Sequence, residues 1–412
     1  MVLSLILGCV KVPIIYNTFV NSCYYAENRE RLLMIYFDNS ATTFVSDAVK
    51  AKISELMEDQ LSANPGALHK LGNRAVELYE GIRKETAGLL GAKPEEIFFT
   101  SCATESANTA IKGYMSRNKR AGNAVISTRT EHKATLECLE YLAKLGYEIR
   151  YVKVGLDGKP VMASLEEELG KGDVALACFT LVNNETGAVL PFADIAKKIK
   201  IMSPSTAIYL DCVQALGKMQ IDLASMGADM CSFSGHKIHS VKGNGVLYVR
   251  KGVRIDPLIV GGGQQDGMRS GTQSPVLAGA FLEALKEVSS EIDEAREEVA
   301  LINNYLRKEL AARGAQILSP DDALPYVLNV SFSGFESETM LHCLEIYDIY
   351  VSTVSACSAK QKKVSYVLLE MGIDRKTAAN AVRLSFSRHN TMDEAYEFIR
   401  HVDEIYEQFL IK

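Results

Sequence analysis

The sequence of 412 residues contains no tryptophan, and its nine cysteines occur in neither the C-x-x-C nor the C-x-x-H spacing of structural zinc sites. An odd number of scattered cysteines also argues against a disulfide framework and suits the reducing cytosol. Glycine and proline occur in ordinary numbers and 47% of the residues are hydrophobic, which excludes a collagen-like or disordered chain. We therefore expect a cytoplasmic globular protein without a metal site.

Neither charge nor hydrophobicity indicates a polyanionic or membrane partner. The 45 basic and 51 acidic residues give a net charge of −6, so the surface has no bulk attraction to nucleic acid. Residues 2–10 form an apolar run, but Lys11 and Pro13 interrupt it. No stretch reaches the roughly 18 to 20 apolar residues that span a membrane. We expect no direct contact with nucleic acid and no membrane insertion.

Residues 1–33 differ from the rest of the chain, because a clear pattern of strands and turns begins only at Met34. Residues 29–31 can be encoded by purine-rich codons that look like a bacterial ribosome-binding site at a suitable distance before a start codon. Our hypothesis is that Met34 is the natural start and that residues 1–33 are a non-native or disordered leader. N-terminal sequencing of the natively expressed protein tests this, and a mature chain beginning at Met1 would contradict it.

From Met34 onward, short apolar runs alternate with amphipathic stretches. Strands are predicted at residues 96–100, 123–127, 175–182, 207–210 and 245–249, and helices at residues 131–145 and 191–201. This alternation predicts an α/β sheet covered by helices. Between residues 275 and 314 the pattern becomes long and helical, and short strands and further helices follow it. We expect a large domain at residues 47–290 and a smaller α+β domain built from residues 34–46 and 291–412.

Polar residues gather directly after several predicted strands, where open α/β sheets bind their ligands. They are Thr104 and Glu105, residues 183–187, Asp211 with Gln214, residues 232–237, and the glycine-containing residues 261–263 and 269–272. Taken singly, each motif is more typical of a turn or a cap, and the chain has neither a GxGxxG nor a GxxxxGK[ST] motif. Together they predict one pocket with a lysine, a carboxylate, neutral hydrogen-bonding groups and a phosphate cradle. Pyridoxal 5'-phosphate (PLP) needs this set.

Ten short motifs resemble those of the cysteine desulfurases, PLP enzymes of the aminotransferase class V group. The motifs are YFDNSATT (36–43), ANPGALHKLG (63–72), TSCATESAN (100–108), TEHKA (130–134), VNNETG (182–187), LDCVQ (210–214), SFSGHK (232–237), GMRSGT (267–272), SAC (355–357) and VRLSF (382–386). The combination of SGHK, RSGT and a downstream SAC is highly specific. The resemblance implies the type I fold of PLP-dependent transferases, with a mostly parallel seven-stranded sheet in the large domain, and a homodimer.

The resemblance also implies roles for individual residues. Lys237 would hold PLP as a Schiff base and move protons, and Asp211 would pair with the protonated pyridine nitrogen. Gln214 and Asn184 would bond the phenolic oxygen of PLP, and Asn184 would also contact the substrate. His132 would stack on the ring and assist acid–base steps. The phosphate group would be bound by Ala103, Thr104, Ser234 and His236, together with Thr272 of the second subunit.

Two residues would act on the substrate, L-cysteine. Arg383 would bind its carboxylate in a bidentate pair. Cys357 lies in a polar segment, residues 354–363, whose three lysines favour the thiolate. It would take the substrate sulfur as a persulfide, release L-alanine and pass the sulfur to an acceptor protein, either an iron–sulfur scaffold or a tRNA sulfurtransferase.

Some positions depart from the family pattern, and rival functions stay open. Cys102 and Cys212 stand where glycine or alanine is usual, Asp266 where arginine is usual, and His389 where phenylalanine is usual. None of these changes removes a residue with an implied role. The alternatives are a class V aminotransferase, a selenocysteine lyase, or a silent partner subunit that relays sulfur without turnover.

Overall fold

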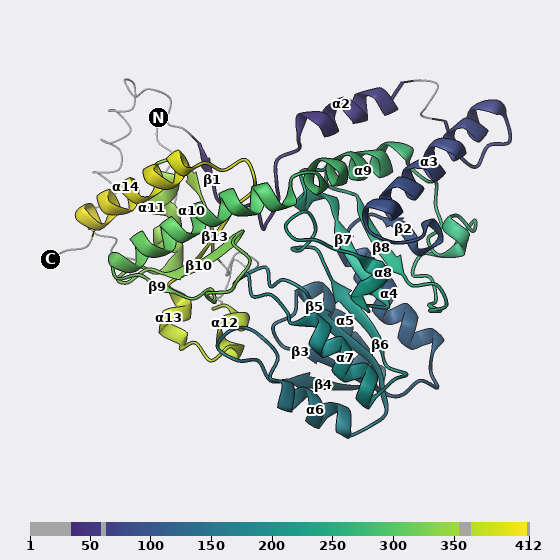
Figure 1. Cartoon of the computed structure of the whole chain (residues 1–412), viewed down its shortest axis with the longest axis horizontal. Coiled ribbons are helices and arrows are strands. Elements are labelled where there is room, and N and C mark those ends of the chain that lie inside the picture. The colour runs from purple at the N-terminus through teal and green to yellow at the C-terminus, as the bar shows by residue number, and fades with distance from the viewer. Residues whose placement is uncertain (1–33, 59–62, 354–363, 410–412) are drawn as a thin grey trace, which may run out of the picture. The chain divides into compact units, whose positions relative to one another are not determined.

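The computed structural model describes residues 34–58, 63–353 and 364–409. A seven-stranded sheet with the order β2-β8-β7-β6-β5-β3-β4 occupies one part of it (Figure 1). The strands are β2 (Ile97–Thr100), β3 (Ala124–Thr128), β4 (Glu148–Val152), β5 (Val174–Thr180), β6 (Ala207–Asp211), β7 (Met230–Ser234) and β8 (Gly245–Val249). Only β8 runs against the others, since its pairs with β2 and β7 are antiparallel and the remaining pairs are parallel. The predicted mostly parallel sheet of seven strands is confirmed.

Helices cover both faces of this sheet, because neighbouring residues of a strand point to opposite faces. The helices in this part are α2 (Asp47–Leu56), α3 (Lys70–Leu89), α4 (Ala103–Arg117), α5 (Lys133–Lys144), α6 (Met162–Gly170), α7 (Phe192–Met202), α8 (Leu223–Met226) and α9 (Pro275–Ser289). Tyr209 of β6 is buried in a cluster with apolar side chains of α4 and α5. Leu210, the next residue, belongs to a second cluster that contains side chains of α7 and α9. The buried strands therefore read as continuous apolar runs.

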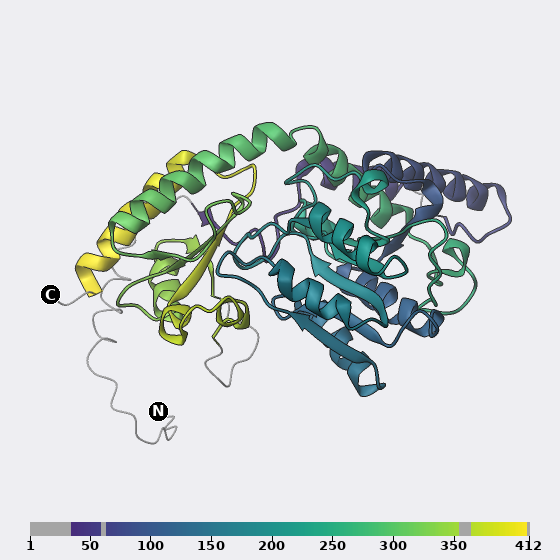
Figure 2. The same ribbon diagram turned by 60° about the horizontal axis from the view of Figure 1, so that its bottom comes forward.

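A second, antiparallel sheet with the order β12-β13-β10-β9 follows later in the chain. Its strands are β9 (Gln316–Ile317), β10 (Val327–Ser331), β12 (Ser352–Thr353) and β13 (Ala381–Ser385). A separate two-stranded sheet consists of β1 (Ile35–Tyr36) and β11 (Ile349–Tyr350). The accompanying helices are α10 (Ile292–Ala312), α11 (Ser337–Glu345), α12 (Tyr366–Glu370), α13 (Arg375–Ala379) and α14 (Met392–Phe409). Helices α10 (green) and α14 (yellow) pack side by side in both views (Figures 1 and 2).

The two sheets draw on separate stretches of sequence, residues 97–249 and residues 316–385. The predicted boundary near residue 290 falls at the short break between α9 and α10. Residues 35–412 nevertheless form one compact unit, so the division into a large and a small domain stays a prediction.

The N-terminal segment connects the two sheets. Residues 35–40 bond to the smaller part of the protein: β1 pairs with β11, and the Ser40 amide donates to Ser385 Oγ at 2.9 Å. A few residues later, the Thr43 and Ser46 amides each donate at 3.0 Å to carbonyl groups of the turn that follows β7. The segment thus crosses from one sheet to the other directly over the ends of the parallel strands.

None of the helices within the described ranges combines the length and the apolar character needed to cross a membrane.

Candidate active site

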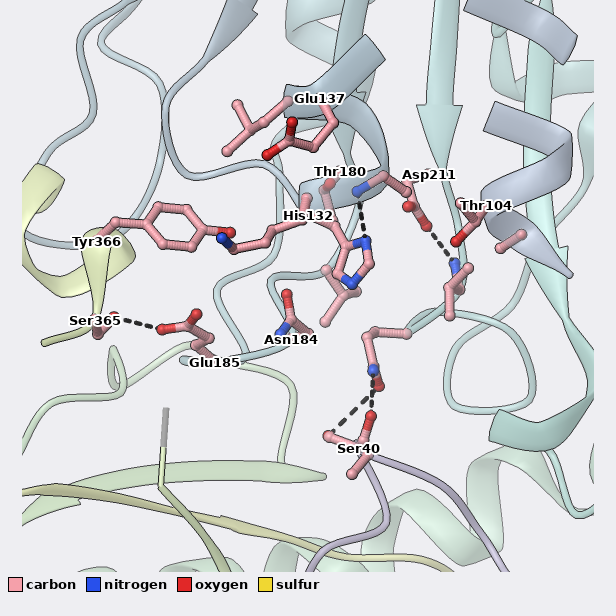
Figure 3. A pocket seen from close by; sticks show the side chains of 18 of the residues that line it. Ser40, Thr104, His132, Glu137, Thr180, Asn184, Glu185, Asp211, Ser365 and Tyr366 are labelled. Carbon is pink, nitrogen blue, oxygen red and sulfur yellow. Dashed lines mark hydrogen bonds between the residues drawn. The ribbon is translucent and has the colours of Figure 1, made fainter. Parts of the chain in front are cut away.

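A pocket of roughly 1210 Å³ lies at the carboxyl ends of the parallel strands. Thr180, Asp211 and Ser234, the last residues of β5, β6 and β7, line it. Arg383 of β13 lines the same pocket, so both sheets contribute. Figure 3 shows several of these side chains, with Asp211, His132 and Asn184 around a common space. This is the position at which open α/β sheets bind ligands.

Asp211 is a buried carboxyl group, 4% exposed. It accepts a hydrogen bond from the Val213 amide at 2.9 Å. Burial raises the pKa of Asp211, while the neighbouring His132 and Lys237 lower it. The charged form of such a carboxyl group is favoured further by any cation placed against it in the pocket.

His132 is the N-cap residue of α5, and its Nδ1 accepts a hydrogen bond from the Ala134 amide at 3.1 Å. Because Nδ1 is an acceptor, the neutral ring carries its proton on Nε2. Burial lowers the pKa of His132, an effect that Asp211 opposes and Lys237 reinforces. The helix cap therefore presents a neutral aromatic ring with one donor to the pocket.

Lys237 lies in a 3₁₀ turn, Gly235–Lys237, directly after β7. Its Nζ donates to the carbonyl oxygens of Ser40 and Ala41, the second at 2.6 Å. Burial, and then the positive charge of Arg383, lower the pKa of Lys237 to about 8. A larger share of this amine is neutral near pH 7 than in an ordinary lysine, as a nucleophile or base requires.

Of the residues predicted to bind phosphate, Ala103, Thr104, Ser234 and His236 line the pocket. Ser234 Oγ is buried and has no hydrogen-bond partner among the described residues, which leaves a hydroxyl group for a ligand. Burial lowers the pKa of His236 to about 4, so its ring is neutral. The N-cap of α4, Cys102, makes no side-chain capping bond. The first amides of this helix, at Ala103 and Thr104, therefore suit an anion.

The two predicted amide side chains also reach the pocket, since Gln214 and Asn184 both line it. Gln214 Nε2 donates to the Ser40 carbonyl at 3.1 Å, the same oxygen that accepts from Lys237. Ser40 and its carbonyl were not predicted as part of the site, although they lie within a quoted motif. The residues present fit PLP: they offer a lysine, a buried carboxyl group, amide donors and an orphaned hydroxyl group beside a helix N-terminus.

Arg383 is paired inside the pocket. Its Nη2 contacts Asp38 Oδ1 at 2.8 Å and its Nη1 donates to the Asn184 carbonyl at 3.1 Å. Arg383 Nε is buried without a hydrogen-bond partner in the described part of the chain. The guanidinium group therefore has capacity left for a carboxylate.

Two predicted residues are not brought to the pocket by the described part of this chain. Thr272 is exposed and does not line the pocket, and its predicted role depends on a second subunit. Cys357 lies outside the described residues, so its role stays a prediction. Within the described ranges, no group of three or more metal-binding side chains occurs.

The sequence predicted no role for two buried carboxyl groups, Glu185 in the pocket and Glu131 next to it. Glu131 Oε1 accepts from Thr128 Oγ1 at 2.6 Å, and Glu185 Oε2 accepts from Ser365 Oγ. Burial raises the pKa of each glutamate to about 7. Tyr366 Oη donates to the Glu131 carbonyl at 2.8 Å, so residues 365–366 are fixed against the pocket at both points. The only signal in the sequence is that both glutamates lie within motifs quoted for other residues.

The sequence profile of the aminotransferase class-V family matches residues 35–398. This range contains every pocket residue described above. The chain belongs to the aminotransferase class-V family. This family is PLP-dependent.

Within the class-V family, the chain is similar to NifS-like proteins and cysteine desulfurases. It is 39% identical over 380 residues to the NifS/IcsS protein homolog of Lactobacillus delbrueckii subsp. bulgaricus, covering 91% of this chain and 98% of that protein. It is 35% identical over 379 residues to a cysteine desulfurase of Nostoc sp., covering 91% and 93%. A solved NifS-like protein superposes with a TM-score of 0.85 at 36% identity, covering 91% of this chain and 100% of that one. The predicted family and fold are confirmed.

The pKa of Glu185 gives this class-V chain a predictable dependence on pH. The folded pKa is about 7 and the ordinary value is 4.5, so between these values the folded state binds more protons than the unfolded state. The free energy of unfolding therefore falls as pH rises through this window. Glutamine does not ionise, so Glu185→Gln should abolish this fall in the free energy of unfolding. At pH 8 the variant should therefore be more stable than wild type by on the order of 2 kcal/mol.

Urea unfolding of the two proteins at pH 4 and pH 8 measures this effect. The difference in the free energy of unfolding between wild type and Glu185→Gln should be small at pH 4 and large at pH 8. Glu77→Gln, at an exposed position, is the matched control and should show no such change. A Glu185→Gln protein that is less stable than wild type at pH 8 would contradict the prediction.

Proposed function

We propose that this protein is a cysteine desulfurase that binds PLP and converts L-cysteine to L-alanine. Sulfur leaves the substrate Cβ for Cys357 Sγ as a persulfide, and the carbon skeleton gains a proton and departs as alanine. The observation that carries the proposal is the convergence of the Lys237 amine and the Asp211 carboxyl group on one pocket that Arg383 also lines. The names of the relatives at 35% identity, cysteine desulfurases, support the choice of substrate.

When bound, PLP supplies an electron sink for the bonds at the substrate α-carbon. Lys237 would hold it covalently, Asp211 would face its pyridine nitrogen, and Gln214 would donate to its phenolic oxygen. The phosphate group would take the orphaned hydroxyl group of Ser234 and the first amides of α4. Each of these groups lines the pocket.

The remaining steps belong to side chains of this chain. Lys237 would take the α-proton, because its lowered pKa of about 8 leaves part of the amine neutral at physiological pH. Arg383 would bind the substrate carboxylate, next to the Asn184 carbonyl that it already contacts. His132 Nε2 would exchange a proton with the substrate, since the helix cap occupies its other nitrogen.

One experiment tests the activity against its rivals. The purified protein with PLP should form alanine from cysteine, and sulfide when a reductant is added. A class V aminotransferase would instead need a keto acid as amino-group acceptor, and a selenocysteine lyase would act on selenocysteine but not on cysteine. A silent sulfur-relay subunit would form no alanine at all.

The partners follow from the same proposal. A homodimer would bring Thr272 of the second subunit to the phosphate, and exposed apolar side chains at Leu258, Ile259 and Val260 lie close to it in sequence. The persulfide would pass to an acceptor protein of iron–sulfur cluster assembly or of tRNA thiolation, in the cytoplasm. Sedimentation of the purified protein tests the dimer.

Asp211→Asn should weaken PLP binding and lower the rate of alanine formation by on the order of 10²-fold. The amide cannot carry the negative charge that favours a protonated pyridine nitrogen, and removing such a preorganised group typically costs this much. The measurement is the rate at saturating PLP, which separates slow chemistry from weak binding.

The control for this variant is Asp229→Asn. Asp229 is also buried, but it pairs with Lys200 and Arg250 away from the pocket, so its loss should reduce stability without changing PLP affinity. A near-normal rate in Asp211→Asn at saturating PLP would show that the assigned role is wrong.

A further inference from the structure

Lys218 is a buried lysine behind the residues that line the pocket. It lies in the turns that follow β6, four residues after Gln214, and is 5% exposed. Gly217 holds the turn in place: its φ is +70°, and a Cβ there would lie 2.6 Å from Val288 Cγ2. The Lys218 amide closes the turn by donating to the Ala215 carbonyl at 3.0 Å. The backbone conformation of this turn therefore keeps the Lys218 side chain in the interior.

The surroundings of this amine do not neutralise its charge. Lys218 Nζ donates to Gln214 Oε1 at 2.8 Å and lies 5.9 Å from the centre of the Tyr326 ring. Burial, and then the positive charges of Lys237 and Arg383, lower the pKa of Lys218 to about 7. Burying an amine without a carboxylate partner destabilises the folded protein, and an apolar side chain of similar length would destabilise it less. Stability alone does not explain a lysine at this position.

The hydrogen bond to Gln214 indicates what the Lys218 amine does. The two ends of a glutamine amide have nearly the same shape, so packing alone does not fix which end faces which neighbour. In its protonated form the Lys218 amine has three donors and no acceptor, so it selects the oxygen. Gln214 Nε2 is then turned the other way, where it donates to the Ser40 carbonyl at 3.1 Å. The same carbonyl accepts from Lys237 Nζ, so a chain of hydrogen bonds joins Lys218 to Lys237.

We propose that Lys218 is a positioning residue that locks the Gln214 amide with its Nε2 donor toward the active site. This inference rests on the proposed function, in which that donor holds the phenolic oxygen of PLP. With the amide reversed, Gln214 Oε1 would face the phenolic oxygen of PLP, and both of these oxygens are acceptors. Lys218 thus acts on the cofactor through Gln214, without touching it.

Lys218→Met tests the proposal, because methionine keeps the length of the side chain and removes the donors. We expect the variant to bind PLP about tenfold more weakly, the size of one net hydrogen bond. The pH midpoint of the visible absorption of bound PLP should also shift. The PLP-free variant should unfold at the same temperature as wild type or a higher one, since it no longer buries a cation. Lys218→Arg, which again offers only donors, should restore most of the affinity.

Two further comparisons separate positioning from a structural role. Lys200→Met removes a lysine that contacts Asp229 and Thr206, and it should leave PLP affinity and the absorption midpoint unchanged. Gln214→Ala should weaken PLP binding as much as Lys218→Met, and the double variant should lose no more than either single variant.

The outcomes are distinct. Wild-type PLP affinity and absorption midpoint in Lys218→Met would overturn the inference while leaving the proposed function intact, and so would additive losses in the double variant. A wild-type protein that bound no PLP would overturn the proposed function and this inference with it.

Discussion

Lys237→Ala is expected to abolish both covalent attachment of PLP and turnover. Lys237 Nζ is the amine that the turn after β7 places in the pocket, with a pKa lowered to about 8. Its loss removes the nucleophile that holds the cofactor and the base that takes the α-proton. We expect the rate of alanine formation to fall at least about 10³-fold, the range seen when a central proton-transfer group is removed.

Reduction with borohydride followed by peptide mapping identifies the attachment site. In the wild type the added cofactor mass should lie on the peptide that contains Lys237, and the alanine variant should carry none. Lys133→Ala is the matched control, because Lys133 also lines the pocket but its amine lies over the Tyr366 ring at 5.8 Å. Cofactor attached to Lys133, or wild-type alanine formation in Lys237→Ala, would show that the lysine assignment is wrong.

Cys357→Ala should separate substrate binding from sulfur transfer. Lys237, Asp211 and Arg383 stay in place, so cysteine should still bind and change the visible absorbance of the cofactor. Alanine and sulfide formation should fall at least about 10³-fold, as expected for a removed nucleophile, because no thiolate is left to take the substrate sulfur.

Mass spectrometry after incubation with cysteine shows which thiol carries the sulfur. The extra sulfur should lie on the peptide with Cys357, and Cys102→Ala and Cys343→Ala should keep their activity. Cys343 is a poor candidate because burial raises its pKa, which disfavours the thiolate. Extra sulfur on Cys102 or Cys343, or full activity in Cys357→Ala, would show that the role assigned to Cys357 is wrong.

The sequence was sufficient to predict most strands of the seven-stranded sheet and ten of the residues that line the pocket. A polar residue that ends a buried apolar run marks the carboxyl edge of a sheet, and Asp211 and Thr180 illustrate this rule. Two strands of the seven-stranded sheet were not predicted, for local reasons. β4 lies at the edge of the sheet and exposes Glu148, and β7 alternates serine with apolar residues, so that it resembles a turn.

The residues that were missed owe their place to contacts between distant parts of the chain. Ser40 meets Gln214 and Lys237 only after the N-terminal segment has crossed the strand ends. Glu185 accepts a hydrogen bond from Ser365, which lies 180 residues further along. Neither hydrophobic periodicity nor local motifs can predict contacts between residues so far apart in the sequence. The roles of the predicted side chains, including Thr272 and Cys357, stay predictions that the variants above test.

The crossing of the N-terminal segment has a consequence for the order in which a ribosome can complete this enzyme. Residues 35–40 emerge well before their partners at residues 348–350 and 385. All strands of the seven-stranded sheet lie before residue 250, and its last covering helix, α9, ends at Ser289, so this part can form while translation continues, since such units generally fold as they emerge. A nascent chain arrested between these points would already hold Lys237 on its turn, but the β11 and Ser385 partners that position Ser40 would still be missing. Aldehyde capture by the lysine is therefore expected to mature only after residues 348–385 have left the ribosome and can contact residues 35–40.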